Sequence, residues 1–116
     1  MIEQKIKEFV TSIEQHKFYE AHEALEEVWF PKRFEKDPEV QFLKGCINAA
    51  VSFELIKRGR IPQSKRVWAN YLKYRQLIYK IDSKHYNSYH NLVRYLDSKG
   101  ISIPYLQMDI HTDKQN

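Results

Sequence analysis

The stretch FYEAHEALEEVW, residues 18–29, constrains the fold more than any other part of the chain. Its apolar residues recur every three or four positions, the spacing that places them on one face of an α-helix. On a helical wheel that advances about 100° per residue from Phe18, Trp29 falls at about 20° and His22 at about 40°. Glu26 falls at about 80°, one turn beyond His22. The pattern predicts an amphipathic helix with a histidine in its apolar face and a glutamate at the edge.

A histidine on an apolar face needs a partner, because a buried polar group left unpaired costs about 1–3 kcal/mol. Glu26 is within reach, since residues four apart are neighbours on a helix. Two interpretations stay open: a buried hydrogen bond that fixes packing, or a metal or catalytic pair, because imidazole and carboxylate ligands suit zinc, manganese and iron. Trp29 is most simply a core residue. The other glutamates of the stretch, Glu20, Glu23 and Glu27, are most simply expected on its solvated face, although Glu23 could reach the site.

The rest of the chain also has helical periodicity. With only three glycines and four prolines among 116 residues, it reads as helices joined by short loops. The predicted helices cover about residues 2–15, 18–30, 38–58, 62–81 and 86–99. We therefore expect an all-α, single-domain bundle of about five helices over residues 1–108, with a frayed tail over residues 109–116.

Several residues mark where these helices should begin and end. Asp37 is a good N-cap for the third helix, because Pro38 then takes the first helical position. Gly59 and Gly100 are expected to end the third and fifth helices. Ser64 is a candidate cap for the fourth. The apolar segment at 101–106 is expected to lie back on the bundle.

The third helix carries a second unusual position. Glu54 falls near the middle of its apolar stripe, and a buried acid is costly unless it is paired or coordinated. It could be the partner of His22, or form an interhelical salt bridge with Arg75 or Arg94. On the same helix, Gly45 would allow a neighbouring helix to approach closely. The wheel places Cys46 opposite the stripe, with no histidine at helical spacing to activate it.

The fourth helix is apolar over a wide arc. Trp68, Leu72 and Tyr79 form a second flank beside its main stripe, so this helix is expected to contact more than one neighbour. One of these neighbours could be another subunit, which makes a homodimer the expected oligomer.

Charge is unevenly distributed along the chain, whose net charge is +4. Residues 14–39 are rich in acids, whereas residues 57–84 hold many bases and the single acid Asp82. The basic half is most simply surface charge. Interleaved aromatic and basic residues could instead bind nucleic acid, although a tyrosine-lined core predicts the same pattern.

Some functional classes find no support. No apolar run approaches the ~18 residues of a membrane span, and the first residues lack the apolar region of a signal peptide. The lone Cys46 excludes an intrachain disulfide and fits a reducing compartment, so the expected location is the cytoplasm. Helix-turn-helix, phosphate-loop and zinc-finger patterns are missing, and the sequence assigns no catalytic residue.

The motif FYEAHEALEEVW resembles the signature of an uncharacterised family of small helical proteins, catalogued as a domain of unknown function, number three-oh-nine. The similarity continues through LKGCINAA at 43–50 and KRG at 57–59, and covers roughly residues 15–80. The resemblance implies an all-α bundle and a metal-binding motif HxxxExxW, which falls here on His22, Glu26 and Trp29. The chain departs most from the family pattern after Gly59, where bulky Val67 and Trp68 stand in place of a small residue.

The leading hypothesis is a polar site centred on His22 and Glu26 and completed by Glu54, which binds a divalent metal such as zinc, manganese or iron. A metal-activated water would make hydrolysis the natural chemistry of such a site. The alternative is a non-enzymatic, homodimeric interaction module that uses the aromatic flank of the fourth helix. Nucleic-acid binding through residues 57–84 is the third hypothesis.

Overall fold

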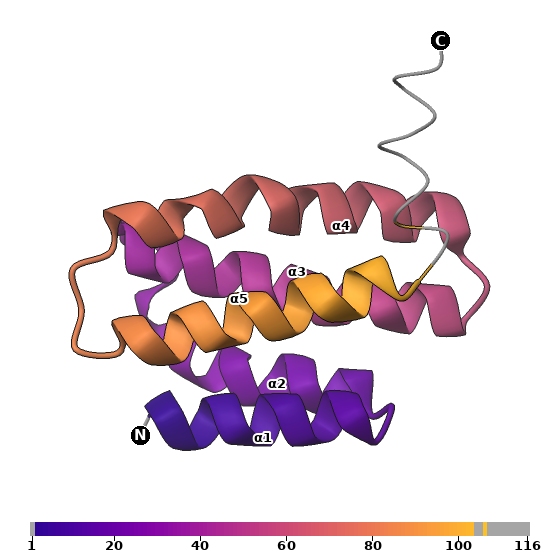
Figure 1. The fold of residues 1–116 in the computed structure, drawn as a ribbon, viewed down its shortest axis with the longest axis horizontal. Coiled ribbons are helices and arrows are strands. Elements are labelled where there is room, and N and C mark those ends of the chain that lie inside the picture. Colours follow the sequence, from indigo (N-terminus) through magenta and orange to yellow (C-terminus); the bar gives the residue numbers. More distant parts are fainter. Residues whose placement is uncertain (1, 104–105, 107–116) are drawn as a thin grey trace, which may run out of the picture.

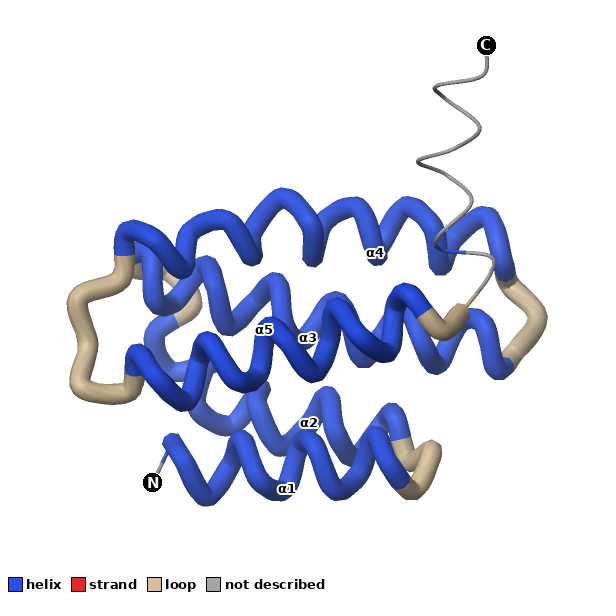
Figure 2. Tube along the Cα trace, in the orientation of Figure 1, coloured by secondary structure: helices blue, strands red, loops and turns tan. Residues whose placement is uncertain are grey.

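The computed structural model describes residues 2–103 and 106, and within them it contains helices and no strand (Figure 2). The elements follow the chain in this order: α1 (Ile2–Glu14), α2 (Phe18–Trp29), the 3₁₀ helix η1 (Phe30–Lys32), α3 (Pro38–Lys57), α4 (Ile61–Arg75), the 3₁₀ helix η2 (Gln76–Lys80) and α5 (Tyr86–Ile101). The predicted all-α fold class and its five helices are confirmed. The tail predicted to fray, residues 109–116, lies outside the described residues.

The helices run along the long axis of the molecule. Helices α1 and α2 form a hairpin on one side, α4 lies on the opposite side, and α3 and α5 run between them (Figure 1). The most extensive contacts of α3 are with α4 and α2, which makes α3 the centre of the bundle. None of the helices in this part of the chain has the length and apolar character needed to cross a membrane.

Helix α3 is buried on most of its surface rather than along one stripe. Its buried residues are Val40, Phe42, Leu43, Gly45, Cys46, Ile47, Ala49, Ala50, Ser52 and Phe53. A Cβ on Gly45 would lie 2.6 Å from Cβ of Tyr74, so the close helix approach expected at this glycine is confirmed. The expectation that Cys46 faces away from the core is wrong, because its side chain is 1% exposed. Because α3 is packed on several sides, it offers no solvent-exposed face on which Cys46 could lie.

The ends of α3 follow the sequence signals. Asp37 Oδ1 accepts a hydrogen bond from the Glu39 amide at 2.7 Å, which confirms the N-cap. Gly59 follows the helix with φ of 77°, a left-handed conformation that glycine adopts without steric cost. The predicted cap of α4 is wrong. Ser64 lies inside that helix, and its hydroxyl donates to the Ile61 carbonyl at 2.7 Å.

Gly100 does not end α5, which continues to Ile101 and has Ser102 as its C-cap. A Cβ on Gly100 would lie 2.1 Å from Cζ2 of Trp68, so the glycine makes room for the indole ring rather than terminating the helix. Of the segment expected to lie back on the bundle, Leu106 is 2% exposed while Ile101 is 64% exposed. The apolar tail is therefore only partly packed in the described residues.

Candidate functional site

Helix α2 holds His22 and Glu26 at the edge of its packed face. The His22 Nε2 atom lies 3.3 Å from Glu26 Oε2, and the two side chains are 24% and 39% exposed. The pair expected to be buried is therefore partly exposed. The buried residues of α2 are Ala21, Ala24 and Leu25. They fall on the wheel at about 300°, 240° and 340°, so the packed face is rotated away from His22 at about 40°.

Glu54 projects from α3 and is partly buried, with a side chain that is 21% exposed. Its Oε2 accepts from the Nε of Arg58, one turn later on the same helix, at 2.6 Å. The salt bridge suggested for Glu54 with Arg75 or Arg94 is therefore not the one formed. Arg75 instead approaches Asp97, with 3.6 Å between Nη1 and Oδ2.

His22 and Glu54, which come from different helices, line the same hollow between α2 and α3. This His22 hollow has a volume of about 280 Å³. Its lining residues are Phe18, Tyr19, His22, Val51, Glu54, Leu55 and Arg58. Most of the wall is apolar, and the polar groups are confined to His22, the Glu54–Arg58 pair and the Tyr19 hydroxyl. Glu26 lines a neighbouring hollow with Glu23, Glu27, Phe30 and Pro31.

The arrangement of these donors does not form a metal site. Among residues 2–103 and 106, no three His, Cys, Asp or Glu side chains lie close enough together to hold a metal ion. His22 Nε2 is directed at Glu26, and Glu54 is engaged by Arg58. A metal bound by His22, Glu26 and Glu54 would require the Glu54–Arg58 pair to open. In the present geometry the predicted ligand set does not fit such an ion.

Comparison with known protein families identifies the chain. A family model described as Domain of unknown function (DUF309) matches residues 6–67. The chain belongs to this family. The match confirms the resemblance read from the sequence, although it begins earlier and ends sooner than the predicted similarity. No curated protein and no solved structure matches the chain.

The segment matched by the DUF309 model contains every residue that lines the His22 hollow, because these residues run from Phe18 to Arg58. The third residue of the HxxxExxW motif, Trp29, is partly buried and packs against the hydrophobic core. Its ring meets Phe30 edge-on, with 6.4 Å between centroids. Trp29 therefore supports the end of α2 and does not line the His22 hollow.

Several residues in or beside the hollow were not predicted from the sequence. Tyr19 is 59% exposed, and its ring centroid lies 5.9 Å from that of His22. Phe18 packs edge-on against Phe53, while Lys57 Nζ lies 5.9 Å from the Phe18 ring centroid. One signal was available in the sequence: Glu54 and Arg58 are four residues apart, the spacing of a helical ion pair.

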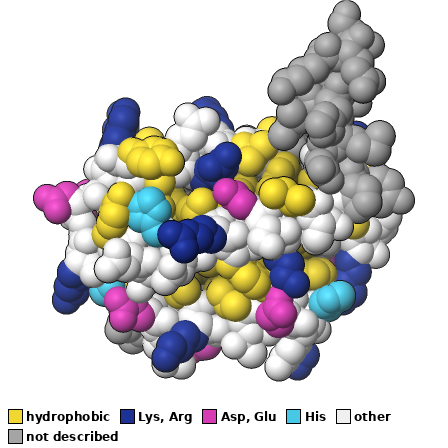
Figure 3. All heavy atoms as spheres, viewed as in Figure 1, with side chains coloured by type: hydrophobic (Ala, Val, Ile, Leu, Met, Phe, Trp, Pro, Cys, Tyr) yellow, Lys and Arg dark blue, Asp and Glu magenta, His cyan; other side chains and the backbone are white. Residues whose placement is uncertain are grey.

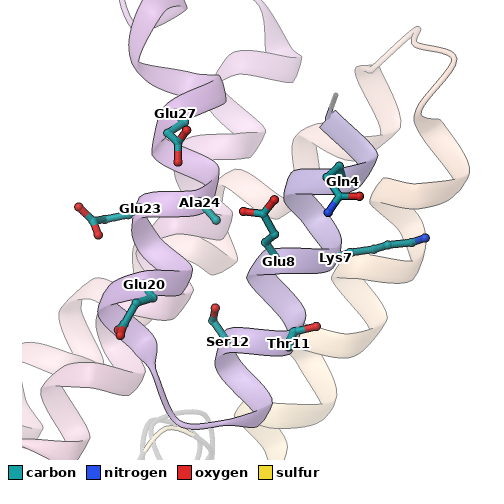
Figure 4. Close-up of a pocket in the computed structure, with 9 residues that line it drawn as sticks. All are labelled: Gln4, Lys7, Glu8, Thr11, Ser12, Glu20, Glu23, Ala24 and Glu27. Atoms are coloured by element: carbon teal, nitrogen blue, oxygen red, sulfur yellow. The ribbon is translucent and has the colours of Figure 1, made fainter.

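A second concave surface lies between α1 and α2 (Figure 4). This groove has a volume of about 390 Å³, and its lining includes the acids Glu8, Glu20, Glu23 and Glu27. Glu8 points across toward α2, whereas Glu23 points away from α1 (Figure 4). Lys5 bridges the two helices by contacting Glu8 at 3.4 Å and Glu27 at 3.1 Å. The three glutamates expected on the outer face of α2 thus belong to an acidic surface separate from the His22 hollow.

The residues of the aromatic flank predicted for the fourth helix differ widely in exposure in the structure. Trp68 is 6% exposed and contacts Tyr71 and Phe53, whereas Tyr79 on η2 is 78% exposed. Trp68 and Tyr71 are therefore core residues, so neither ring can stack on a nucleic-acid base. Cys46 is also enclosed, and burial raises the pKa of its thiol, which keeps it protonated and unreactive.

Proposed function

We propose that this DUF309 protein is a binding protein and that the His22 hollow receives a small amphipathic ligand with an anionic head. The single observation that supports it is the composition of the hollow: apolar walls from two helices with polar groups at a few defined positions. Ligand sites in proteins commonly have this composition. The proposal assigns no reaction to the chain.

The chemistry of the ligand's head group follows from the hydrogen-bond donors of the hollow that the protein itself does not use. Arg58 is 61% exposed and gives its Nε to Glu54, so its terminal amino groups remain free to bind a ligand. A guanidinium binds carboxylate, sulfonate or phosphate through charge-assisted hydrogen bonds. Phe18, Val51 and Leu55 would contact the apolar body of the ligand.

A suitable probe is anilinonaphthalene sulfonate, which combines an aromatic body with one anionic group and fluoresces when it leaves water. We expect saturable binding at one site per chain. Val51→Trp should fill the hollow and weaken binding at least about tenfold, and Arg58→Gln should weaken it by roughly tenfold through the lost charge. Val67→Trp is the matched control, because Val67 is also partly exposed on a helix but does not line the hollow.

Two results would refute the proposal. One is binding that does not saturate, as expected for adsorption to general apolar surface. The other is equal affinity of the Val51→Trp and Val67→Trp proteins, with circular dichroism showing that both are folded.

Divalent-metal binding is the second candidate. It rests on the contact of His22 with Glu26 at 3.3 Å beside a hollow that Glu54 also lines, and it requires the Glu54–Arg58 pair to open. Zinc, manganese and iron titrations of the untagged protein test it, with the His22→Ala, Glu26→Ala double variant as the comparison. Near-stoichiometric metal that is lost in the variant would favour this candidate over the organic ligand. Absence of binding in both proteins would remove it.

The homodimer remains a further proposal. Because Trp68 is buried within the chain, the flank available to a partner is reduced to Leu72 and Tyr79. Light scattering at micromolar concentration tests it, since a monomer has a mass of 14.0 kDa and a dimer twice that value. A monomer mass at the highest soluble concentration would rule the dimer out.

A further inference from the structure

Three aromatic rings gather at the surface where η2 meets the start of α5. Tyr79 is 78% exposed and Tyr86 is 38% exposed, and both meet His90. The His90 ring centroid lies 4.3 Å from that of Tyr86 and 6.4 Å from that of Tyr79. Both contacts are edge-to-face, so no two rings of the aromatic patch, Tyr79, Tyr86 and His90, are stacked face to face.

Three basic residues lie close to this patch along the chain, on η2, on the loop that follows it and on α5. Lys80 follows Tyr79, Lys84 comes two residues before Tyr86, and Arg94 lies one helical turn beyond His90; all three are exposed. Within residues 2–103 and 106, none of these cations forms an ion pair with an acid. From 76 to 96 the chain contains a single acid, Asp82. Two acids from other helices also contact this segment: Glu3 meets His85 and Ser88, and Glu39 meets Ser83 and Tyr89. The face of the molecule seen in Figure 3 shows a histidine flanked by hydrophobic side chains, with basic side chains close by.

Exposed aromatic rings and unpaired cations are the two components of a surface that binds single strands. Nucleic-acid bases stack on aromatic rings without sequence preference, and Lys and Arg neutralise the phosphates. The patch carries the polar tips of tyrosine and histidine rather than Leu or Ile, and exposed Asn87 and Asn91 adjoin it in the sequence. This composition favours a polar, anionic and aromatic partner over an apolar protein surface or a lipid tail.

We propose that the aromatic patch and its cations, Lys80, Lys84 and Arg94, bind single-stranded nucleic acid over a few nucleotides. The surface lies outside the residues matched by the DUF309 model and outside the His22 hollow. It is therefore independent of the proposed function. It also differs from the site suggested by the basic sequence alone, because Trp68 and Tyr71 are in the core while Tyr86, His90 and Arg94 are added by the fold.

The test is fluorescence anisotropy with short labelled oligothymidylate and oligouridylate, and with a duplex of the same length, over a range of salt. We expect both single strands to bind more tightly than the duplex. With three cations and a slope of about −0.7 per phosphate, log affinity should fall with log salt with a slope of about −2. Lys80→Gln with Lys84→Gln should reduce that slope by about 1.4, whereas Lys32→Gln with Lys36→Gln should leave it unchanged.

The aromatic contribution is tested separately. Tyr79→Ala with Tyr86→Ala should weaken single-strand binding at least about tenfold, because stacking of one base changes affinity by roughly fivefold to more than hundredfold. Phe34→Ala is the control, since Phe34 is 86% exposed but lies after η1, outside both the aromatic patch and the His22 hollow. Circular dichroism checks that this variant is folded, because Tyr86 is only 38% exposed and packs against His90.

Four outcomes would overturn the proposal. They are no binding at low salt, equal or tighter binding of the duplex, equal affinities of the Tyr79→Ala/Tyr86→Ala and Phe34→Ala proteins, and a salt slope unaffected by loss of Lys80 and Lys84. A preference for oligouridylate over oligothymidylate would support the proposal and identify RNA as the partner. The reverse preference would support it with DNA as the partner.

Discussion

The contact between α3 and α4 at Gly45 predicts a sharp response to a single methyl group. In Gly45→Ala the new Cβ would lie 2.6 Å from the Tyr74 Cβ and 3.7 Å from its Cα. Non-bonded carbon atoms prefer separations of about 3.5–4.0 Å, so the helices must part by roughly 1 Å. The Tyr74 Cβ is fixed to the backbone and cannot rotate out of the way. Relief therefore requires movement of a whole helix rather than of one side chain.

The magnitude follows from two opposing terms. Overpacking a core costs about 1–3 kcal/mol, and the upper end applies because backbone must move. Replacing glycine with alanine inside a helix contributes about 1 kcal/mol of stability. The expected net loss is about 2 kcal/mol in the free energy of unfolding, measured by urea denaturation with far-UV circular dichroism. The control Lys44→Ala, at the preceding exposed position, should change stability by less than about 0.5 kcal/mol. A Gly45→Ala protein at least as stable as the wild type would refute the packing argument.

Three further predictions follow from polar and buried groups. Tyr71→Phe removes a hydroxyl that donates to Asp97 Oδ1 at 2.8 Å, and should cost about 1 kcal/mol in urea denaturation; no loss would mean that the bond contributes nothing. The Lys99 ammonium bonded to Glu14 lowers the pKa of that carboxyl. Because the folded pKa is lowered, the stabilisation is present above the unfolded value of about 4.3 and is lost as pH falls through the folded value. An NMR titration should show an acid-shifted Glu14 midpoint that moves part of the way back in Lys99→Met, where the Tyr95 hydroxyl still lowers the pKa; an identical midpoint in both proteins would contradict the assignment. The Cys46 thiol should react with a disulfide reagent only after denaturant unfolds the chain, whereas rapid reaction in the native state would place it at the surface.

Features that depend on neighbouring residues in the sequence could be predicted well. The N-cap at Asp37 and the left-handed Gly59 are set by local backbone chemistry, and both are as expected. Helical periodicity likewise located all five helices, because a buried face repeats every three to four residues whatever the fold. The DUF309 family was identified from the motif in α2 for the same reason, since a motif is a local pattern.

Features that depend on which helices meet could not be predicted in this way. The wheel of α2 was centred on Phe18 and Trp29, but both are only partly buried, and the packed face is rotated away from His22. That rotation is set by α1 and α3 together, so the partly exposed position of His22 required the tertiary structure. Gly100 looked like a helix terminator because nothing in the sequence indicates that Trp68 packs against it.

The candidate site likewise combines features that the sequence predicts with features that depend on the tertiary structure. That His22 and Glu54 lie beside one hollow could be suggested from two unusual polar positions in apolar stripes. The pairing of Glu54 with Arg58 changes the chemistry of that hollow, because the carboxylate is then satisfied within its own helix. A wheel analysis that searches for partners on other helices overlooks this contact. The arrangement therefore favours a ligand that uses the free donors of Arg58 over a metal that needs Glu54.

The most direct test of the proposed site is a titration of isotopically labelled protein with anilinonaphthalene sulfonate, followed by amide NMR shifts. If the His22 hollow is the binding site, the saturable shifts will be concentrated at residues 18–22 and 51–58, and Val51→Trp will raise the ligand concentration at their midpoint at least about tenfold. Saturable shifts concentrated elsewhere, or an unchanged midpoint in Val51→Trp, would contradict the assignment of the hollow as the ligand site.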